Sequence, residues 1–386
     1  MTVPEIDPTD PAVLHDPFTA YRRAGEQSPL ARMRVPGMGP LWVVTRHEQA
    51  RQVLGDPRFE LNAASFLRPP GIPEHCLPYL RTMAEIDGPE HTRLRRLAAP
   101  AFTARRAAEF RPRVEEIVGR LLDALPPHGP VDLLEHFARP LPADVICELV
   151  GIPEDDRARW RRYGAAVAAG HGPEFIEAIP HIVEDAKAAV TRRRAEPGDD
   201  VISVLLAVED GLDDVELVAL VWQLVLAGQT PTNLIANAVE VLLTHPEQLA
   251  ALRADPALAP RAVEELTRWT TPQLLTTPRW AREDVEIGGV LVRRGEPVTT
   301  AIVAANRDPR AFAEPERLDL GRAAAPGHLG YGHGPHFCLG AAFARVQTEV
   351  ALTALLDRFP RLAPAGEVRH APDGGTWRVA HLPVTY

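Results

Sequence analysis

Cysteine and lysine are both scarce in this sequence of 386 residues. The three cysteines, Cys76, Cys147 and Cys338, lie far apart and cannot supply the disulfide framework of a small secreted protein. We therefore expect the chain to work in a reducing, cytoplasmic compartment. Lys187 is the only lysine, so arginine carries nearly all of the positive charge. The formal net charge of −10 argues against a protein that binds nucleic acid through its overall charge.

Membrane-targeting features are also missing. The first residues, M-T-V-P-E-I-D-P-T-D-P, contain neither a basic region nor an apolar run, so we expect neither a signal peptide nor a membrane anchor. Hydrophobic residues make up 45% of the chain and charged residues 24%, which is typical of a globular protein with a large core. No internal repeat and no low-complexity segment interrupts the sequence.

Apolar residues recur with helical spacing over much of the chain, and short runs rich in β-branched residues predict a small β region. Between residues 58 and 86 closely spaced prolines interrupt both patterns, which predicts a long irregular loop. The predicted helices are 18–24, 48–54, 114–125, 141–150, 176–190, 213–245, 261–271 and 341–358, and the predicted strands are 41–45, 285–292, 297–303 and 377–383.

A glycine-rich stretch, residues 330–340, reads G-Y-G-H-G-P-H-F-C-L-G and comes directly before a predicted helix. Four glycines and a proline predict a tight loop. Cys338 therefore lies where unpaired N–H groups and the helix dipole favour a thiolate. Such a thiolate suits a metal, iron–sulfur or haem ligand or a nucleophile, and a cysteine that only fills the core is the alternative. Zinc needs several ligands at defined spacing, whereas haem iron needs one axial cysteine.

A second informative stretch, A-G-Q-T-P-T at 227–232, lies inside the long apolar helix predicted between Asp213 and His245. Pro231 lacks the N–H that would bond the carbonyl of Ala227, and its ring presses against that carbonyl. The helix must therefore kink or open here, beside Gly228. A kink of this kind leaves room for a small ligand next to backbone polar groups, although a kink that serves packing alone is the alternative.

The glycine-rich stretch resembles the haem-binding loop of the cytochrome P450 family, in which an aromatic residue, Gly, Gly, His or Arg, Cys and Gly follow at fixed spacing. Tyr331 stands where the family has Phe, and the other positions match. The resemblance extends over the chain and implies one domain, 1–386, mainly α with a small β region. Haem b would lie between the kinked helix and the cysteine loop. The matching residues are Tyr331, Gly332, Gly334, His336, Cys338 and Gly340.

The resemblance also implies roles for individual residues. His91 and Arg95, four apart on one face of a helix that starts near Pro89, would hold the haem propionates. Arg279 and His336 would complete that site, with Cys338 as the metal ligand and Gly340 beside it. Arg93, Arg96 and Arg345 are candidates for the surface that meets an acidic electron donor, and an ordinary solvated surface is the favoured alternative for each of them. Glu265, Arg268 and Arg317 would form a buried structural network.

The kinked segment resembles the family's oxygen-binding segment but departs from it. Thr230 stands where the family has an acid and Pro231 where it has the threonine used in proton delivery, and the segment is one residue short. We expect Ala227, Gly228, Thr230 and Thr232 to form the catalytic segment, with Thr232, water or a substrate hydroxyl supplying the missing polar group. The residues expected at the substrate are Phe66, Leu67, Leu274, Leu275 and Thr276.

The implied activity is that of a haem-thiolate monooxygenase that hydroxylates or epoxidises a small organic molecule, such as a secondary-metabolite intermediate, because thiolate ligation favours O–O cleavage. Electrons would come from a ferredoxin and its NAD(P)H-dependent reductase, because the chain has no reductase-like segment. Two alternatives stay open at this point: an atypical haem-thiolate enzyme, driven by peroxide or closing a ring oxidatively, and a haem protein that only binds a ligand.

Overall fold

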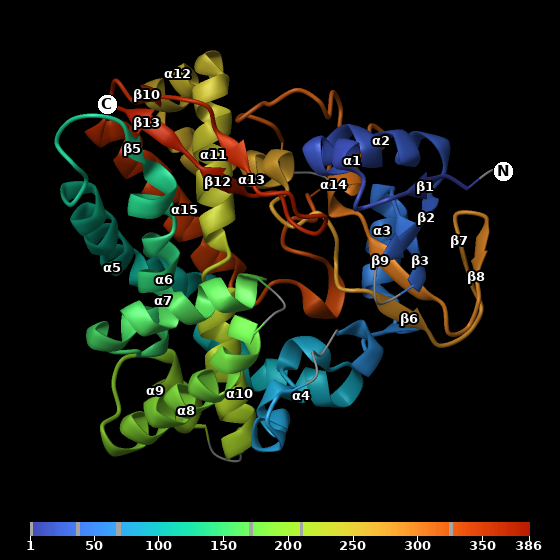
Figure 1. Cartoon of the computed structure of the whole chain (residues 1–386), viewed down its shortest axis with the longest axis horizontal. Coiled ribbons are helices and arrows are strands. Elements are labelled where there is room, and N and C mark those ends of the chain that lie inside the picture. The colour runs from blue at the N-terminus through green and yellow to red at the C-terminus, as the bar shows by residue number, and fades with distance from the viewer. Residues whose placement is uncertain (1–2, 36–38, 67–70, 170–172, 209–210, 324–326) are drawn as a thin grey trace.

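The computed structural model describes residues 3–35, 39–66, 71–169, 173–208, 211–323 and 327–386. α-Helices dominate it, and Figure 1 shows most of them gathered on the side opposite the N-terminus. The helices are α1 Pro11–His15, α2 Pro17–Gln27, α3 His47–Gly55, α4 Gly88–Ala98, α5 Ala104–Asp123, α6 Pro140–Val150, α7 Glu154–Ala169, α8 Pro173–Ala195, α9 Val201–Leu206, α10 Asp214–Ala227, α11 Pro231–Thr244, α12 Pro246–Ala254, α13 Ala259–Thr270, α14 Ile302–Ala305 and α15 Ala341–Arg358.

The strands form one larger sheet and several small ones. The larger sheet has six strands in the order β1-β2-β3-β9-β6-β4, in which β1 pairs with β2 and β3 with β9 in parallel and the other neighbours are antiparallel. It lies near the N-terminus in Figure 1. The strands are β1 Glu5–Ile6, β2 Leu30–Val35, β3 Gly39–Val44, β4 Phe59–Glu60, β5 Val131–Asp132, β6 Arg279–Ala281, β7 Val285–Ile287, β8 Val290–Val292, β9 Pro297–Thr300, β10 Ala363–Pro364, β11 Arg369–His370, β12 Val379–His381 and β13 Pro383–Thr385.

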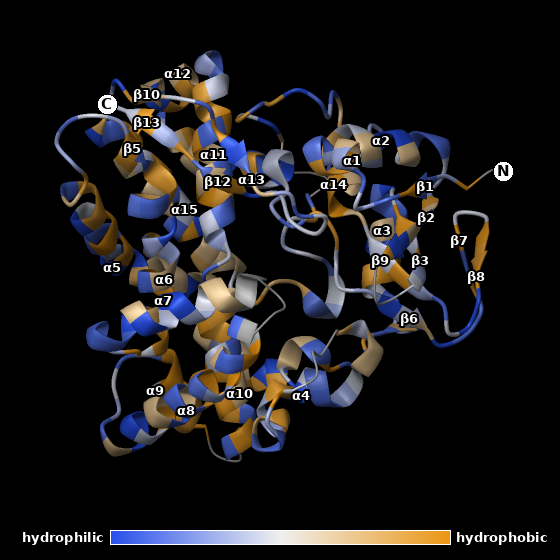
Figure 2. Cartoon of the chain, viewed as in Figure 1, coloured by the Kyte–Doolittle hydropathy of each residue, from blue (hydrophilic) through white to orange (hydrophobic). Residues whose placement is uncertain are grey.

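Buried apolar side chains form one large cluster among the helices and two smaller clusters on the two faces of the larger sheet. Strand β3 contributes side chains to both of the smaller clusters: Trp42 and Val44 pack on one face, and Leu41 and Val43 pack on the other. This follows from the alternation of side chains along a strand. In Figure 2 most helices alternate between apolar and polar residues, as expected when one face of a helix meets a core.

The structure confirms the mainly helical architecture with a small β region, and each predicted helix has a counterpart. The helix predicted between Asp213 and His245 opens into two, α10 and α11, with residues 228–230 in a turn between them. The long irregular loop predicted between residues 58 and 86 contains a short strand and 3₁₀ turns in its described parts, residues 59–66 and 71–86. Across the described residues, every helix is too short or too polar to cross a membrane.

Candidate active site

The cysteine loop folds tightly because two glycines adopt a backbone conformation that side chains disfavour. Gly332 has φ of 74° and Gly334 has φ of 71°. A Cβ on Gly334 would lie 2.6 Å from the carbonyl oxygen of Leu54 on α3, so only glycine lets the loop approach this helix. The amide of Cys338 then donates to the carbonyl of Tyr331 at 2.8 Å, and α15 begins three residues after the cysteine.

Cys338 opens onto a cavity of about 260 Å³, which we call the inner cavity. The break between α10 and α11 lines the same cavity, as do the aromatic side chains of Phe102 and Phe343. Most of the remaining wall is apolar. Its other lining residues include Met83, Val145, Ile146, Leu149, Leu224, Ala227, Gly228, Thr230, Pro231 and Leu339. The prediction that a ligand site lies between the kinked helix and the cysteine loop therefore has a physical counterpart.

Thr230 repairs the hydrogen bonding that Pro231 disrupts. The carbonyl of Ala227 cannot receive a bond from Pro231, and instead it accepts from the hydroxyl of Thr230 at 2.8 Å and from the Thr230 amide at 3.1 Å. The hydroxyl hydrogen is thereby committed to the backbone, while the hydroxyl oxygen keeps acceptor capacity. Thr230 lines the inner cavity, whereas Thr232 is not among the residues that line it.

Gln229 turns away from the inner cavity and fastens the break to α7. Its side-chain amide donates to the carbonyls of Val225 and Trp160, each at 3.3 Å. A Cβ on Gly164 would lie 2.0 Å from the Gln229 side chain, and a Cβ on Gly228 would lie 2.2 Å from Ile146. Glycine at these two positions therefore allows α6 and α7 to close around the break.

Basic side chains gather at one edge of the inner cavity. The rings of His91 and His336 stack with centroids 4.1 Å apart, and Nε2 of His336 donates to Asp87 at 2.7 Å. Burial, followed by the positive charges of His336 and Arg95, lowers the pKa of His91 to about 4, so His91 is neutral at pH 7 and acts as a hydrogen-bonding group. Burial alone would raise the pKa of Asp87, but hydrogen bonds from His336 and the Leu61 amide lower it.

Two arginines lie near these histidines, Arg95 in the wall of the inner cavity and Arg279 in the wall of a neighbouring one. Arg95 lines the inner cavity and donates to the carbonyl of Phe337. Arg279, on β6, is only 6% exposed, and its guanidinium makes no hydrogen bond or ion pair with any residue that the structure describes. Burial lowers its pKa, and the charge of Asp87 opposes this effect. A buried cation without a counter-ion is costly, so this edge calls for an anion. Arg279 and His91 also line a neighbouring polar cavity of about 540 Å³.

The Cys338 thiol is open to the cavity but surrounded by protein on its other sides. This burial raises its pKa, against the N–H of Gly340 and the positive charges of Arg95 and Arg345. The helix terminus thus does not by itself produce the thiolate that the sequence led us to expect. A metal ion bound there would favour the deprotonated ligand and would supply what the protein environment lacks.

The expected substrate residues do not gather at the inner cavity. Leu274 is 1% exposed and packs in the core on one face of the sheet, with Leu275 against the same cluster. The hydroxyl of Thr276 accepts from the amide of Thr300 at 3.0 Å. Phe66 lies at the end of a 3₁₀ turn and is not among the residues that line either cavity, and Leu67 lies outside the described residues.

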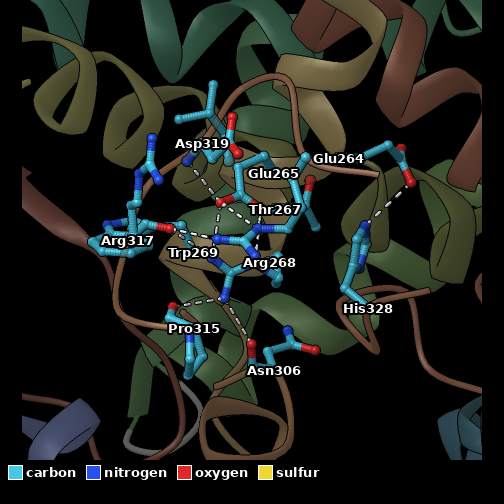
Figure 3. A network of polar contacts seen from close by, with 12 residues as sticks. Glu264, Glu265, Thr267, Arg268, Trp269, Asn306, Pro315, Arg317, Asp319 and His328 are labelled. Atoms are coloured by element: carbon cyan, nitrogen blue, oxygen red, sulfur yellow. Dashed lines mark hydrogen bonds and ion pairs between the residues drawn. The ribbon is translucent and has the colours of Figure 1, made fainter. Parts of the chain in front are cut away.

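The buried network around Glu265 corrects one sequence prediction. Arg268 forms two bonds to Glu265, at 2.7 and 2.8 Å, and bonds to the carbonyls of Asn306 and Pro315 (Figure 3). The third member is Arg322, whose Nε contacts both oxygens of Glu265 at 3.1 and 3.0 Å. Arg317, predicted for this role, is 63% exposed and offers only its backbone carbonyl.

A second set of polar contacts ties the segments on either side of the cysteine loop to the same helix, α13. Glu264 pairs with Arg345, at 2.5 and 3.1 Å, and with His328 at 3.2 Å, and Figure 3 shows the His328 contact. Arg345 also lies over the ring of Tyr331, 4.5 Å from its centroid. Arg93 pairs with Glu216. Of the three arginines expected at an electron donor, two are thus engaged within the chain, and Arg96 is exposed.

Several site residues were missed from the sequence. Asp87, which orients His336, was signalled only by its place before Gly88 and Pro89, where helix-capping residues are common. Gln223 and Gln347 also line the inner cavity, and the amide oxygen of each is buried without a partner among the described residues. Their polar side chains interrupt otherwise apolar helix faces, which is the one signal that could have identified them.

The comparisons with known proteins agree with this geometry. The sequence model of the family described as "Cytochrome P450" matches residues 171–382. The chain is 41% identical to cytochrome P450 107B1 of Saccharopolyspora erythraea over 98% of this chain and 96% of that protein. It is 44% identical to mycinamicin IV hydroxylase/epoxidase of Micromonospora griseorubida, over 88% and 87%. The solved structure of cytochrome P450 CYP109Q5 from Chondromyces apiculatus superposes with a TM-score of 0.91 at 31% identity, over 99% and 98%.

A mainly helical fold with a cysteine loop facing a broken central helix is thus that of a haem-thiolate protein. The chain belongs to the cytochrome P450 family, and it is a P450 monooxygenase with haem b as cofactor.

The residues present fit this cofactor. Haem b is a flat apolar ring with an anionic edge, and the inner cavity offers apolar and aromatic walls, the basic groups of Arg95, His91 and His336 and the thiol of Cys338, with Arg279 in the neighbouring polar cavity that His91 also lines. A cysteine thiolate is one of the axial ligands that haem iron accepts. Without such an anion the buried guanidinium of Arg279 has no hydrogen-bonded counter-ion among the described residues, and this makes Arg279 the strongest single indication of an anion site.

Proposed function

We propose that Cys338 is the axial thiolate ligand and that Arg279, Arg95, His91 and His336 receive the haem propionates, with Gly340 donating its amide to the sulfur. The observation that carries this proposal is that Cys338 and the α10–α11 break line one cavity, with basic groups at its edge. Neutral His91 and the arginines offer different donors, so the anionic edge would be bound by charge and hydrogen bonds together.

We propose that the enzyme hydroxylates or epoxidises a small organic molecule, an intermediate of secondary metabolism, in line with the hydroxylase/epoxidase among its relatives. When bound, haem supplies the activation of O₂ for insertion of one oxygen atom. The chain's own part is to hold the substrate beside the haem, next to the α10–α11 break, to exclude water with the apolar wall of the inner cavity, and to present the hydroxyl of Thr230 at the break.

Thr230 takes the position of the missing acid but acts there as a hydrogen-bond acceptor. Its hydroxyl hydrogen bonds Ala227, so its oxygen presents lone pairs to a donor in the cavity. We propose that Ala227, Gly228 and Thr230 form the catalytic segment and that water or a substrate hydroxyl supplies the proton. Thr232, the fourth residue expected in this segment, lies in the first turn of α11 and does not line the inner cavity. Electrons come from a ferredoxin and an NAD(P)H-dependent reductase, with Arg96 among the exposed cations available to an acidic donor.

The first test is the absorption spectrum of the dithionite-reduced protein under carbon monoxide. Wild type should give the strongly red-shifted Soret band of a thiolate-ligated haem, and Cys338→Ala should lose both that band and activity. Cys76→Ala, which removes a buried cysteine far along the chain, is the matched control and should keep the band. Retention of the shifted band in Cys338→Ala would refute the assignment of Cys338 as the axial ligand.

The absence of a carboxylic acid at the break favours a second candidate, oxidation driven by peroxide, because peroxide brings its own protons to the site. Turnover with hydrogen peroxide and with the ferredoxin system should be compared on the same substrate. Faster, well-coupled turnover with peroxide would favour this candidate, and efficient NAD(P)H-coupled turnover would exclude it as the main activity.

A further inference from the structure

A second cavity of about 200 Å³, which we call the outer cavity, lies between α4, α10 and the 3₁₀ turn Met83–Glu85. Figure 1 places α4 beside α10. Eight of its twelve described lining residues are apolar, and the other four, Arg81, Glu90, Asp213 and Glu216, are charged. The apolar lining residues are Pro78, Met83, Ile86, Leu94, Leu212, Val215, Ala219 and Leu220.

The outer and inner cavities follow the same helices. On α10, Glu216, Ala219 and Leu220 face the outer cavity, and Gln223, Leu224 and Ala227 continue the same stripe into the inner cavity at helical spacing. On α4, Leu94 faces the outer cavity and the next residue, Arg95, faces the inner one. Both helices therefore run past both compartments.

Among the residues that the structure describes, Met83 is the one that lines both cavities. It is buried in a 3₁₀ turn, and its unbranched side chain has three rotatable bonds, so it can change rotamer at small cost. At the outer rim, Arg81 pairs with Glu90 at 2.6 Å and Arg93 pairs with Glu216. Partly exposed ion pairs of this kind are weak and can open.

We propose that the outer cavity is a second substrate compartment and that Met83 is the gate between it and the inner cavity. This rests on the proposed function, because the reacting end of the substrate must lie opposite Cys338. The substrate class is then an elongated molecule whose apolar body extends beyond the inner cavity, with its far end among the side chains that line the outer one. Met83 thereby determines which chain lengths the enzyme accepts.

The test uses 1-alkylimidazoles from ethyl to dodecyl on the haem-loaded enzyme, because the imidazole anchors at the iron and the tail must find room. Binding is followed by the shift of the Soret band. In wild type the affinity should rise about fourfold for each buried methylene, and should keep rising once the inner cavity is full. Met83→Trp and Leu220→Trp should both abolish the gain for long tails, and Leu220→Trp, which lines the outer cavity and not the inner one, should leave ethylimidazole within about twofold of wild type.

Leu77→Trp is the matched control, because Leu77 is exposed on the neighbouring 3₁₀ segment Glu74–Leu80 and lines neither cavity. Met83→Ala guards against misfolding of the tryptophan variants: it should speed association of dodecylimidazole several-fold more than it speeds association of ethylimidazole. If the long-tail gain survives both tryptophan variants, or if Met83→Ala changes neither rate, the proposal is overturned. A wild-type enzyme that gives no Soret shift even with ethylimidazole would instead refute the proposed haem site.

Discussion

Replacing Arg322 with leucine should destabilise the fold by about 3 kcal/mol, whereas Arg317→Leu should change stability by less than about 0.5 kcal/mol. The side chain of Arg322 is 15% exposed and contacts both oxygens of Glu265. Its remaining nitrogens donate to the carbonyls of Ala313, Glu314 and Arg317, at 2.6, 3.2 and 2.7 Å. Leucine leaves all of these acceptors without that donor.

The size of this destabilisation depends on the partners that the Glu265 carboxylate retains in Arg322→Leu. Breaking a buried ion pair costs about 3–5 kcal/mol when it leaves a bare charge. Here Arg268 and the amide of Asp319 still bond the Glu265 carboxylate, so the lower end of that range applies. Arg317 by contrast forms one exposed pair with Glu314 at 3.4 Å, and an exposed pair contributes about 0–1 kcal/mol. Its backbone carbonyl is unchanged by the substitution.

The assay is urea unfolding of the haem-loaded protein, followed by far-ultraviolet circular dichroism and by Soret absorbance, with the free energy of unfolding taken only where the two transitions coincide. Wild type, Arg322→Leu and Arg317→Leu should be compared at one pH and one haem occupancy. Equal destabilisation in the two variants, or a larger loss in Arg317→Leu, would refute the assignment of Arg322 to the buried network.

Arg279→Leu should weaken haem binding about 10- to 100-fold, as expected for loss of a charged hydrogen bond, whereas Arg282→Leu, in the exposed pair with Glu60, should not; equal haem retention in both would contradict the anion site. Thr230→Ala should lower the ratio of product to NAD(P)H consumed and Thr230→Ser should keep it, so an unchanged ratio in Thr230→Ala would remove the hydroxyl from proton delivery. Burial opposes the ionisation of Glu264, but hydrogen bonds from His328 and Arg345 outweigh it and lower its pKa to about 2. Its contribution is therefore present above pH 4.5 and lost as the pH falls to about 2, so Glu264→Gln should flatten the pH dependence of stability in that window, and an unaltered slope would contradict this.

The parts of the site that depend on local chemistry could be predicted from the sequence. Glycines at positive φ made the cysteine loop recognisable, and the missing N–H of Pro231 located the break in the central helix. The pair of Glu265 and Arg268 is also local, because residues three apart share a helix face. Each of these features follows from a few neighbouring residues, and each was found.

The parts that depend on distant segments could not be read in the same way. Arg317 and Arg322 lie in one loop, and the turns within that loop decide which of them reaches Glu265. Leu274 stands near Arg279 in sequence, yet it packs in the core on one face of the sheet and does not line the inner cavity. Proximity along the chain therefore misled both predictions, because neither the path of a loop nor the face of a sheet is set by the residue itself.

The departure at the broken helix shows the same division between local and distant causes. Pro231 removes a backbone donor, and Thr230 next to it restores a bond to Ala227, so the sequence contains both the defect and its local repair. The rest of the repair comes from elsewhere: Gln229 bonds α7, where Gly164 leaves room for it. Because the hydroxyl that faces the cavity already gives its hydrogen to the backbone, this site can accept a hydrogen bond there but cannot act as an acid, and the proton needed for oxygen activation has to arrive with solvent or with the substrate.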